Sequence, residues 1–153
     1  MGVDALASAL AGAERALLDT MVFSYHLAGH PRYAPLTTWL LCAIEAGEMM
    51  GLTTTVTLAE LLTRPAQAND QAALRDYEAY LLHFPNLGIA PLDVSLARET
   101  ALVRAATGLR TPDAVQIAAA RVHNADAIIT NDRRWAGKVH DRSLILLDDY
   151  IKP

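Results

Sequence analysis

The pattern of hydrophobic and polar positions along the chain predicts five short strands. Apolar or β-branched runs of four to seven residues with little polar alternation are typical of strands buried on both faces of a parallel sheet. The weakest candidate is LGIAPL, because its proline favours a strand edge or end. The five runs are 16–22, 53–57, 87–92, 126–130 and 144–147.

Helices are expected between these runs. Apolar residues recur with helical spacing over 36–44. A second helix is expected to start with a capping box, Thr57 and Glu60, and to end at Pro65. Three more are predicted at 70–83, 94–108 and 111–123, the last with Thr111 as its N-cap. Strands that alternate with helices predict an α/β sandwich with a mainly parallel sheet.

Length and composition agree with one globular domain. The chain has 153 residues, of which 52% are hydrophobic and 20% charged, which excludes a disordered or multidomain protein. Its single cysteine, Cys42, is expected to pack in the core and favours a reducing compartment. No segment reads as a membrane span or a signal peptide. We therefore expect a cytoplasmic protein with no membrane partner.

The net charge is −4, from 13 basic and 17 acidic side chains. This balance argues against a protein that coats nucleic acid through a broad positive field. If four carboxylates are clustered around cations, however, 13 basic and 13 acidic side chains remain and the outer surface is neutral. Arginine makes up 11 of the 13 basic residues, and its guanidinium suits bidentate phosphate contacts.

Four acidic residues lie where the predicted strands end. In open parallel sheets, ligands bind outside the carboxyl ends of the strands, where the following loops and helix N-termini converge. Asp19 lies toward the end of the first predicted strand, and Glu60 lies in the helix after the second. Asp132 comes just beyond the strand 126–130, and Asp113 joins the others if its helix begins on the same side.

Taken alone, three of these acids have a structural explanation. Glu60 completes a capping box, Asp113 is stabilised by a helix dipole, and Asp132 can accept backbone hydrogen bonds in its turn. Asp19 differs, because a carboxylate inside an apolar strand costs several kcal/mol unless it is paired, hydrogen-bonded or bound to metal. Four anions at one pole repel each other unless a cation neutralises them. Hard oxygen ligands suit Mg²⁺ or Mn²⁺, and such a site indicates phosphodiester hydrolysis.

Three segments carry motifs that are loose alone but specific in their order and spacing. They are LLDTMVFSYHLAGHPRY (17–33), TLAELLTRP (57–65) and GLRTPDAVQIAAARVHNADAIITNDRRW (108–135). Together they resemble the PIN-domain ribonucleases, in particular the VapC-type toxins of bacterial toxin–antitoxin pairs. The resemblance implies a single PIN-like domain over 16–153, a three-layer α/β/α sandwich with a mainly parallel central sheet. Residues 1–15 precede it as an N-terminal extension to which we assign no role.

The resemblance also implies the site and its chemistry. The implied catalytic, metal-binding acids are Asp19, Glu60, Asp113 and Asp132. Thr130 is an accessory hydroxyl, and Met21 departs from the polar residue that many relatives carry there, which loosens the local hydrogen bonding. The implied reaction is Mg²⁺- or Mn²⁺-dependent cleavage of RNA, commonly tRNA or rRNA. The implied partner is a cognate antitoxin whose C-terminal tail enters the cleft, and the family usually forms homodimers.

Other polar residues are interpreted from their surroundings. Arg133 and Arg134 are candidates for contacting RNA phosphate or the antitoxin tail, and an exposed basic turn explains them equally well. Weaker candidates for the same contacts are Arg64, Arg110 and Lys138. His26 and His30 are interpreted as surface or loop residues, since no cysteine or third histidine is near them.

Two other functions stay open from the sequence. One is a PIN nuclease of RNA processing that is not a toxin, and the other is a non-catalytic PIN-like module that binds RNA or protein. The presence of all four acids disfavours the second. A phosphatase of the haloacid dehalogenase type would need Asp-x-Asp at the first strand, where Asp19 is instead followed by Thr20 and Met21.

Overall fold

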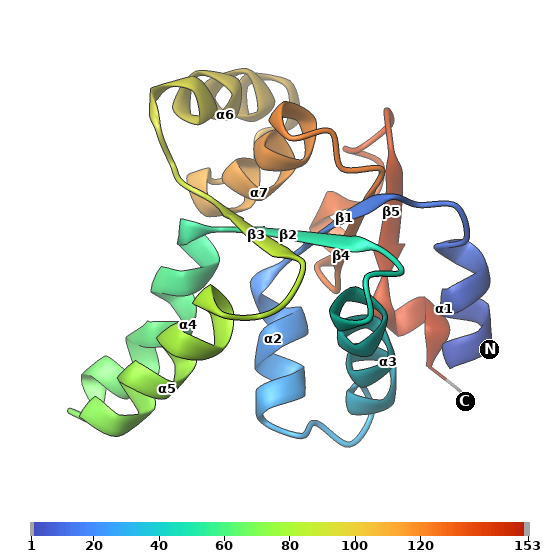
Figure 1. The fold of residues 1–153 in the computed structure, drawn as a ribbon. Helices are drawn as coiled ribbons and strands as arrows, with labels where there is room; N and C mark the ends of the chain where they lie inside the picture. Colours follow the sequence, from blue (N-terminus) through green and yellow to red (C-terminus); the bar gives the residue numbers. More distant parts are fainter. Residues whose placement is uncertain (1, 152–153) are drawn as a thin grey trace.

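The computed structural model describes residues 2–151, and its centre is a sheet of five parallel strands (Figure 1). Met1, in the predicted extension, and residues 152–153, at the end of the predicted domain, lie outside the described residues. The strands are β1 (Arg15–Leu18), β2 (Met50–Thr54), β3 (Leu87–Ala90), β4 (Ala127–Thr130) and β5 (Ser143–Leu146). They lie in the order β3-β2-β1-β4-β5, and each neighbouring pair is parallel. The predicted parallel sheet is confirmed, with the weak candidate strand at its edge as β3.

Helices cover both faces of this sheet (Figure 1). They are α1 (Val3–Ala9), α2 (Thr20–Leu27), α3 (Ala34–Glu45), α4 (Thr55–Gln67), α5 (Gln71–Leu82), α6 (Val94–Thr107) and α7 (Thr111–Val122). Two short 3-10 helices follow the last strands, at Arg133–Trp135 and Leu147–Tyr150. None of these helices has the length and apolar character needed to cross a membrane.

Neighbouring residues of the central strand pack against opposite layers. Ala16 and Leu18 belong to the core that contains residues of α2 and α3, whereas Leu17 belongs to the core beneath α6 and α7. All three are fully buried, as expected for a strand covered on both faces. The three-layer α/β/α sandwich is therefore confirmed.

The N-terminal segment contributes the helix α1 to this fold. Leu6 is fully buried, and Leu10 is nearly so. Both lie in the same core as residues of α2 and α3. The division of the chain into an extension over 1–15 and a domain over 16–153 stays a prediction.

The first strand is shorter than the apolar run 16–22 predicts. β1 ends at Leu18, and α2 begins at Thr20 with Asp19 as its N-cap. The apolar run continues because α2 also buries side chains, including Val22, and a run this short does not separate a buried strand from a buried helix. The strand prediction is wrong beyond Leu18, and Asp19 lies at a strand-to-helix junction.

The second strand is predicted over 53–57 and spans Met50–Thr54 in the structure. Both ends of α4 and the start of α7 also differ from prediction. Because α4 begins before Thr57, this residue lies inside the helix and forms no capping box with Glu60. Pro65 does not end α4, which continues for two more residues to Gln67. The N-cap of α7 is Arg110 rather than Thr111.

Candidate active site

The connectivity of the chain changes direction at the centre of the sheet. From β1 the chain runs to β2 and β3 on one side and then crosses over to β4 and β5 on the other. A switch of this kind opens a crevice outside the carboxyl ends of the two central strands. Here these strands are β1, which Asp19 follows directly, and β4, which precedes Asp132 by two residues.

A cleft of about 390 Å³ contains all four predicted acids. Asp19 caps α2, Glu60 lies on α4, Asp113 lies in the first turn of α7, and Asp132 precedes a 3-10 helix. The other lining residues are Thr20, Met21, Ser24, Arg110, Pro112 and Arg134. The structure thus brings carboxyl groups from four separate segments to one cleft.

Asp19 is the most buried of the four acids, at 8% exposure. Its Oδ1 accepts a hydrogen bond from the backbone N–H of Thr20 at 2.8 Å, and its Oδ2 accepts one from the Thr130 hydroxyl at 2.7 Å. Burial raises the pKa of Asp19 to about 6 although both hydrogen bonds lower it, and the charges of Glu60 and Asp113 raise it further. The protein alone therefore stabilises this carboxylate incompletely.

Two of the acids share one arginine. The Nε of Arg134 donates to Asp132 Oδ1 at 2.9 Å, and its Nη2 donates to Asp132 Oδ2. The same Nη2 lies 3.5 Å from Asp113 Oδ2. Hydrogen bonds from Arg134 hold the pKa of Asp132 below its usual value. Arg134 therefore bridges Asp132 and Asp113 with its positive charge.

The chemistry of the cleft fits a hard divalent cation. Carboxylate oxygens are the ligands that Mg²⁺ and Mn²⁺ prefer, and a buried, poorly compensated carboxylate such as Asp19 gains from a nearby cation. As the side chains lie, no three Asp, Glu, His or Cys groups within residues 2–151 converge closely enough to hold one ion. Arg134 is bonded to two of the four acids, so their convergence on an ion requires this side chain to move.

A buried polar network, which was not predicted from the sequence, lies beside the acids. Gln116, on α7, is 1% exposed. Its Nε2 donates to Thr57 Oγ1 at 2.8 Å and to Asp19 Oδ1 at 3.4 Å, and its Oε1 accepts from Thr54 Oγ1 at 3.0 Å. One signal was present in the sequence, because Gln116 lies three residues after Asp113 and therefore on the same helix face.

The predicted basic residues divide between the cleft and the surrounding surface. Arg110 and Arg134 line the cleft. Arg133 instead pairs with Asp148 at 3.8 Å and with Asp149 at 3.1 Å. The nearest candidates for a phosphate contact are therefore Arg110 and Arg134.

Met21 makes local contacts at the wall of the cleft. Its sulfur accepts a hydrogen bond from the backbone N–H of Asn131 at 2.9 Å. The Thr130 hydroxyl lies 3.9 Å from the same sulfur. Met21 thus places a thioether sulfur, which is only a weak hydrogen-bond acceptor, between α2 and the end of β4.

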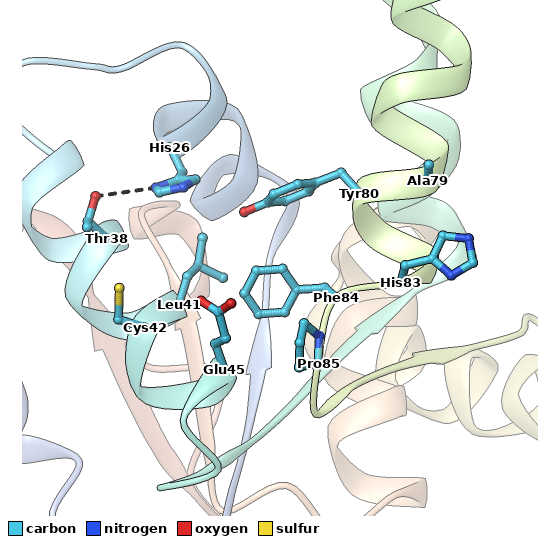
Figure 2. Close-up of a pocket in the computed structure, with 10 residues that line it drawn as sticks. All are labelled: His26, Thr38, Leu41, Cys42, Glu45, Ala79, Tyr80, His83, Phe84 and Pro85. Carbon is cyan, nitrogen blue, oxygen red and sulfur yellow. Dashed lines mark hydrogen bonds between the residues drawn. The ribbon is translucent and has the colours of Figure 1, made fainter.

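A second cavity, of about 410 Å³, is shown in Figure 2 and shares no lining residue with the acidic cleft. Cys42 lines it and is exposed, which corrects the prediction that this thiol packs in the core. Its neighbours Leu41 and Ala43 are buried instead, so the apolar face of α3 is rotated away from Cys42.

His26 belongs to α2 and is half-buried, with its Nδ1 3.4 Å from Thr38 Oγ1.

Comparison with known proteins identifies a family and a shared fold. The family model of the PIN domain matches residues 16–139. No curated protein matches the chain significantly in sequence.

Solved structures from three bacteria superpose on most of the chain. FitAcB from Neisseria gonorrhoeae matches with a TM-score of 0.64 and 21% identity, over 86% of this chain and 97% of that one. VapBC2 from Rickettsia felis, bound to a promoter DNA fragment, matches with 0.63 and 15%, over 85% and 96%. A toxin–antitoxin complex from Klebsiella pneumoniae matches with 0.62 and 20%, over 84% and 98%. At these identities the similarity establishes the fold.

Proposed function

This chain belongs to the PIN domain family, and from that premise we propose that it is a metal-dependent endoribonuclease and the toxin of a type II toxin–antitoxin pair. The observation that carries the proposal is that Asp19, Glu60, Asp113 and Asp132 line one cleft at the switch point of the sheet. Arg134 pairs with Asp132 and Asp113, but the hydrogen-bond donors to Asp19 are uncharged, so the repulsion among the four carboxylates is only partly compensated within the protein. The proposed reaction is hydrolysis of RNA phosphodiester bonds with Mg²⁺ or Mn²⁺.

Each part of the cleft has a role in this proposal. The four acids would hold the ion, which supplies activation of a water molecule and stabilisation of charge on the leaving oxygen. The Thr130 hydroxyl and the Thr20 N–H orient the Asp19 carboxylate by hydrogen bonds to its two oxygens. Arg110 and Arg134 lie on the cleft wall, where a guanidinium can bind an RNA phosphate.

The toxin role and the partner are supported by the structures that share the fold. The Klebsiella pneumoniae match is a toxin–antitoxin complex, and the Rickettsia felis match is a VapBC assembly bound to promoter DNA. We propose a cognate antitoxin whose tail enters the acidic cleft, a homodimeric toxin, and cytoplasmic tRNA or rRNA as the target. A small reading frame beside the gene whose product suppresses toxicity on coexpression would support this role, whereas a gene without one favours a nuclease of RNA processing.

Cleavage of RNA by the purified protein should depend on a divalent cation. We expect hydrolysis of tRNA or rRNA with Mn²⁺ or Mg²⁺, its loss in EDTA and its return with excess Mn²⁺, because the arginines of the cleft cannot activate a bound water as a divalent cation does. Gel analysis and sequencing of the RNA ends give the products. Cleavage that persists in EDTA would contradict the mechanism, and RNA binding without cleavage in any metal would favour the non-catalytic module.

Removal of the arginine that bridges two acids should tighten metal binding. In Arg134→Ala we expect Mn²⁺ affinity to rise by about two- to fivefold, because the guanidinium competes with the ion for Asp132 and Asp113 and exposed ion pairs contribute little each. Titration calorimetry with Mn²⁺ measures it. Arg133→Ala is the matched control, since Arg133 pairs with Asp148 and Asp149. Equal affinities in the two variants would show that Arg134 does not compete.

A further inference from the structure

One buried amide connects the elements that carry three of the four acids. Gln116 lies on α7, three residues after Asp113. Its Nε2 bonds to Thr57 of α4, which lies three residues before Glu60, and to Asp19 at the start of α2. Residues three apart share one face of a helix, so the amide lies on the acid-bearing face of both helices.

The amide of Gln116 is fully engaged within the protein. Its two N–H donors go to Thr57 and Asp19, and its carbonyl oxygen accepts from the Thr54 hydroxyl. The Thr57 hydroxyl also lies 3.1 Å from that of Thr20, so α2 and α4 are joined a second time. A buried amide with all its partners in place has one orientation, because rotating it would leave polar groups unpaired.

The donors around Asp19 nearly fill the acceptor capacity of its carboxylate. A carboxylate accepts at about four lone-pair positions. The Thr20 N–H and Gln116 Nε2 use Oδ1, and the Thr130 hydroxyl uses Oδ2. About one position is therefore left, on Oδ2. None of these donors carries a charge, so they fix the carboxylate without neutralising it.

We propose that Gln116, braced by Thr54 and Thr57, is a positioning residue that holds the Asp19 carboxylate in the orientation in which it binds the divalent cation. The inference rests on the proposed function. A lysine or arginine in place of Gln116 would compete with the ion for Asp19, and an apolar residue would leave Oδ1 with one donor fewer. A neutral amide satisfies both requirements, and it ties Asp19 to the helices of Glu60 and Asp113.

The test is the affinity of the whole protein for Mn²⁺ alone, measured by titration calorimetry. Gln116→Met keeps the length and volume of the side chain and removes its hydrogen bonds. We expect its Mn²⁺ affinity to fall by about 10- to 100-fold, as is typical when a partner of a metal ligand is lost. RNA cleavage should show a lower kcat, with KM within about twofold of the wild type, because Gln116 lies behind Asp19 and not on the cleft wall.

A pair of threonine variants separates positioning from a loss of stability. Thr57→Val removes the anchor of the amide, and Thr100→Val removes another buried helical hydroxyl, which bonds to the Leu96 carbonyl on α6. Both should lower the thermal unfolding temperature of the metal-free protein. Only Thr57→Val should also weaken Mn²⁺ binding. This pair decides the question if Gln116→Met does not fold.

The outcomes distinguish this inference from the proposed function. Mn²⁺ affinity in folded Gln116→Met within about twofold of the wild type, or equal effects of the two threonine variants, overturns the positioning role. A wild type that binds no Mn²⁺ overturns both. A wild type that binds Mn²⁺ but cleaves no RNA overturns the proposed function alone, and the binding data still decide the role of Gln116.

Discussion

Asp19→Asn is expected to lower the rate of metal-dependent RNA cleavage by about three orders of magnitude. The substitution keeps the size of the side chain and removes the charge of the one acid that lies directly at the switch point of the sheet. A metal ion contributes several kcal/mol of transition-state stabilisation, and each 1.36 kcal/mol corresponds to a tenfold change in rate. The measurement is kcat at saturating Mn²⁺ and RNA, with circular dichroism to verify folding.

Asp76→Asn provides the matched control for this prediction. Asp76 is an exposed acid on α5 and does not line the cleft, so the same change in net charge should leave kcat within about twofold of the wild type. If Asp19→Asn kept more than about a tenth of the activity while folded, Asp19 would be a structural cap of α2 and no metal ligand.

The layers of the fold were predictable from the sequence, and the points where strands become helices were not. A strand covered on both faces presents a continuous apolar run, so β1, β4 and β5 could each be located, whereas the β-branched run 53–57 overlaps β2 only at Thr53 and Thr54. At Asp19 and at Thr55, however, a strand passes into a helix with almost no turn between them. The apolar run 16–22 continues across the first junction and the β-branched run 53–57 across the second, and a short window of residues contains no period that would mark the change.

The acids of the cleft could be predicted for a topological reason. All strands of a parallel sheet have their carboxyl ends at one edge, so acids that follow the strands are gathered there whatever their separation in sequence. The partners of these acids depend on where side chains point. The role of Gln116 was not predicted, because this residue lies in an Ala-rich helix far in sequence from Asp19, to which it bonds. Arg134 was expected to contact an external phosphate, but it bonds to Asp132 and Asp113.

The charge on Asp19 is expected to destabilise the metal-free protein by about 3 kcal/mol at neutral pH. Burial raises the pKa of this carboxyl from 3.8 to about 6. Between these two pH values the folded state binds a proton that the unfolded chain has already lost. Above about pH 6 both states are charged and the folded state bears the full cost, roughly two pKa units at 1.36 kcal/mol each. Below about pH 4 both states are protonated and the cost disappears. This contribution therefore lowers stability as pH rises from about 4 to about 6.

Asp19→Asn isolates this contribution from those of other acids. The pKa values of Asp126, Asp132 and Asp148 are lowered, so their stabilisation is lost as pH falls, in the wild type and the variant alike. In EDTA, the free energy of unfolding in urea should favour the variant over the wild type by about 2 kcal/mol more at about pH 7.5 than at about pH 4.5. Added Mn²⁺ should then stabilise the wild type more than the variant, because the variant keeps only three of the four carboxylates proposed to hold the ion. A difference that does not change with pH would mean that the Asp19 carboxylate is already compensated within the protein, and the physical reason for a cation in the cleft would be lost.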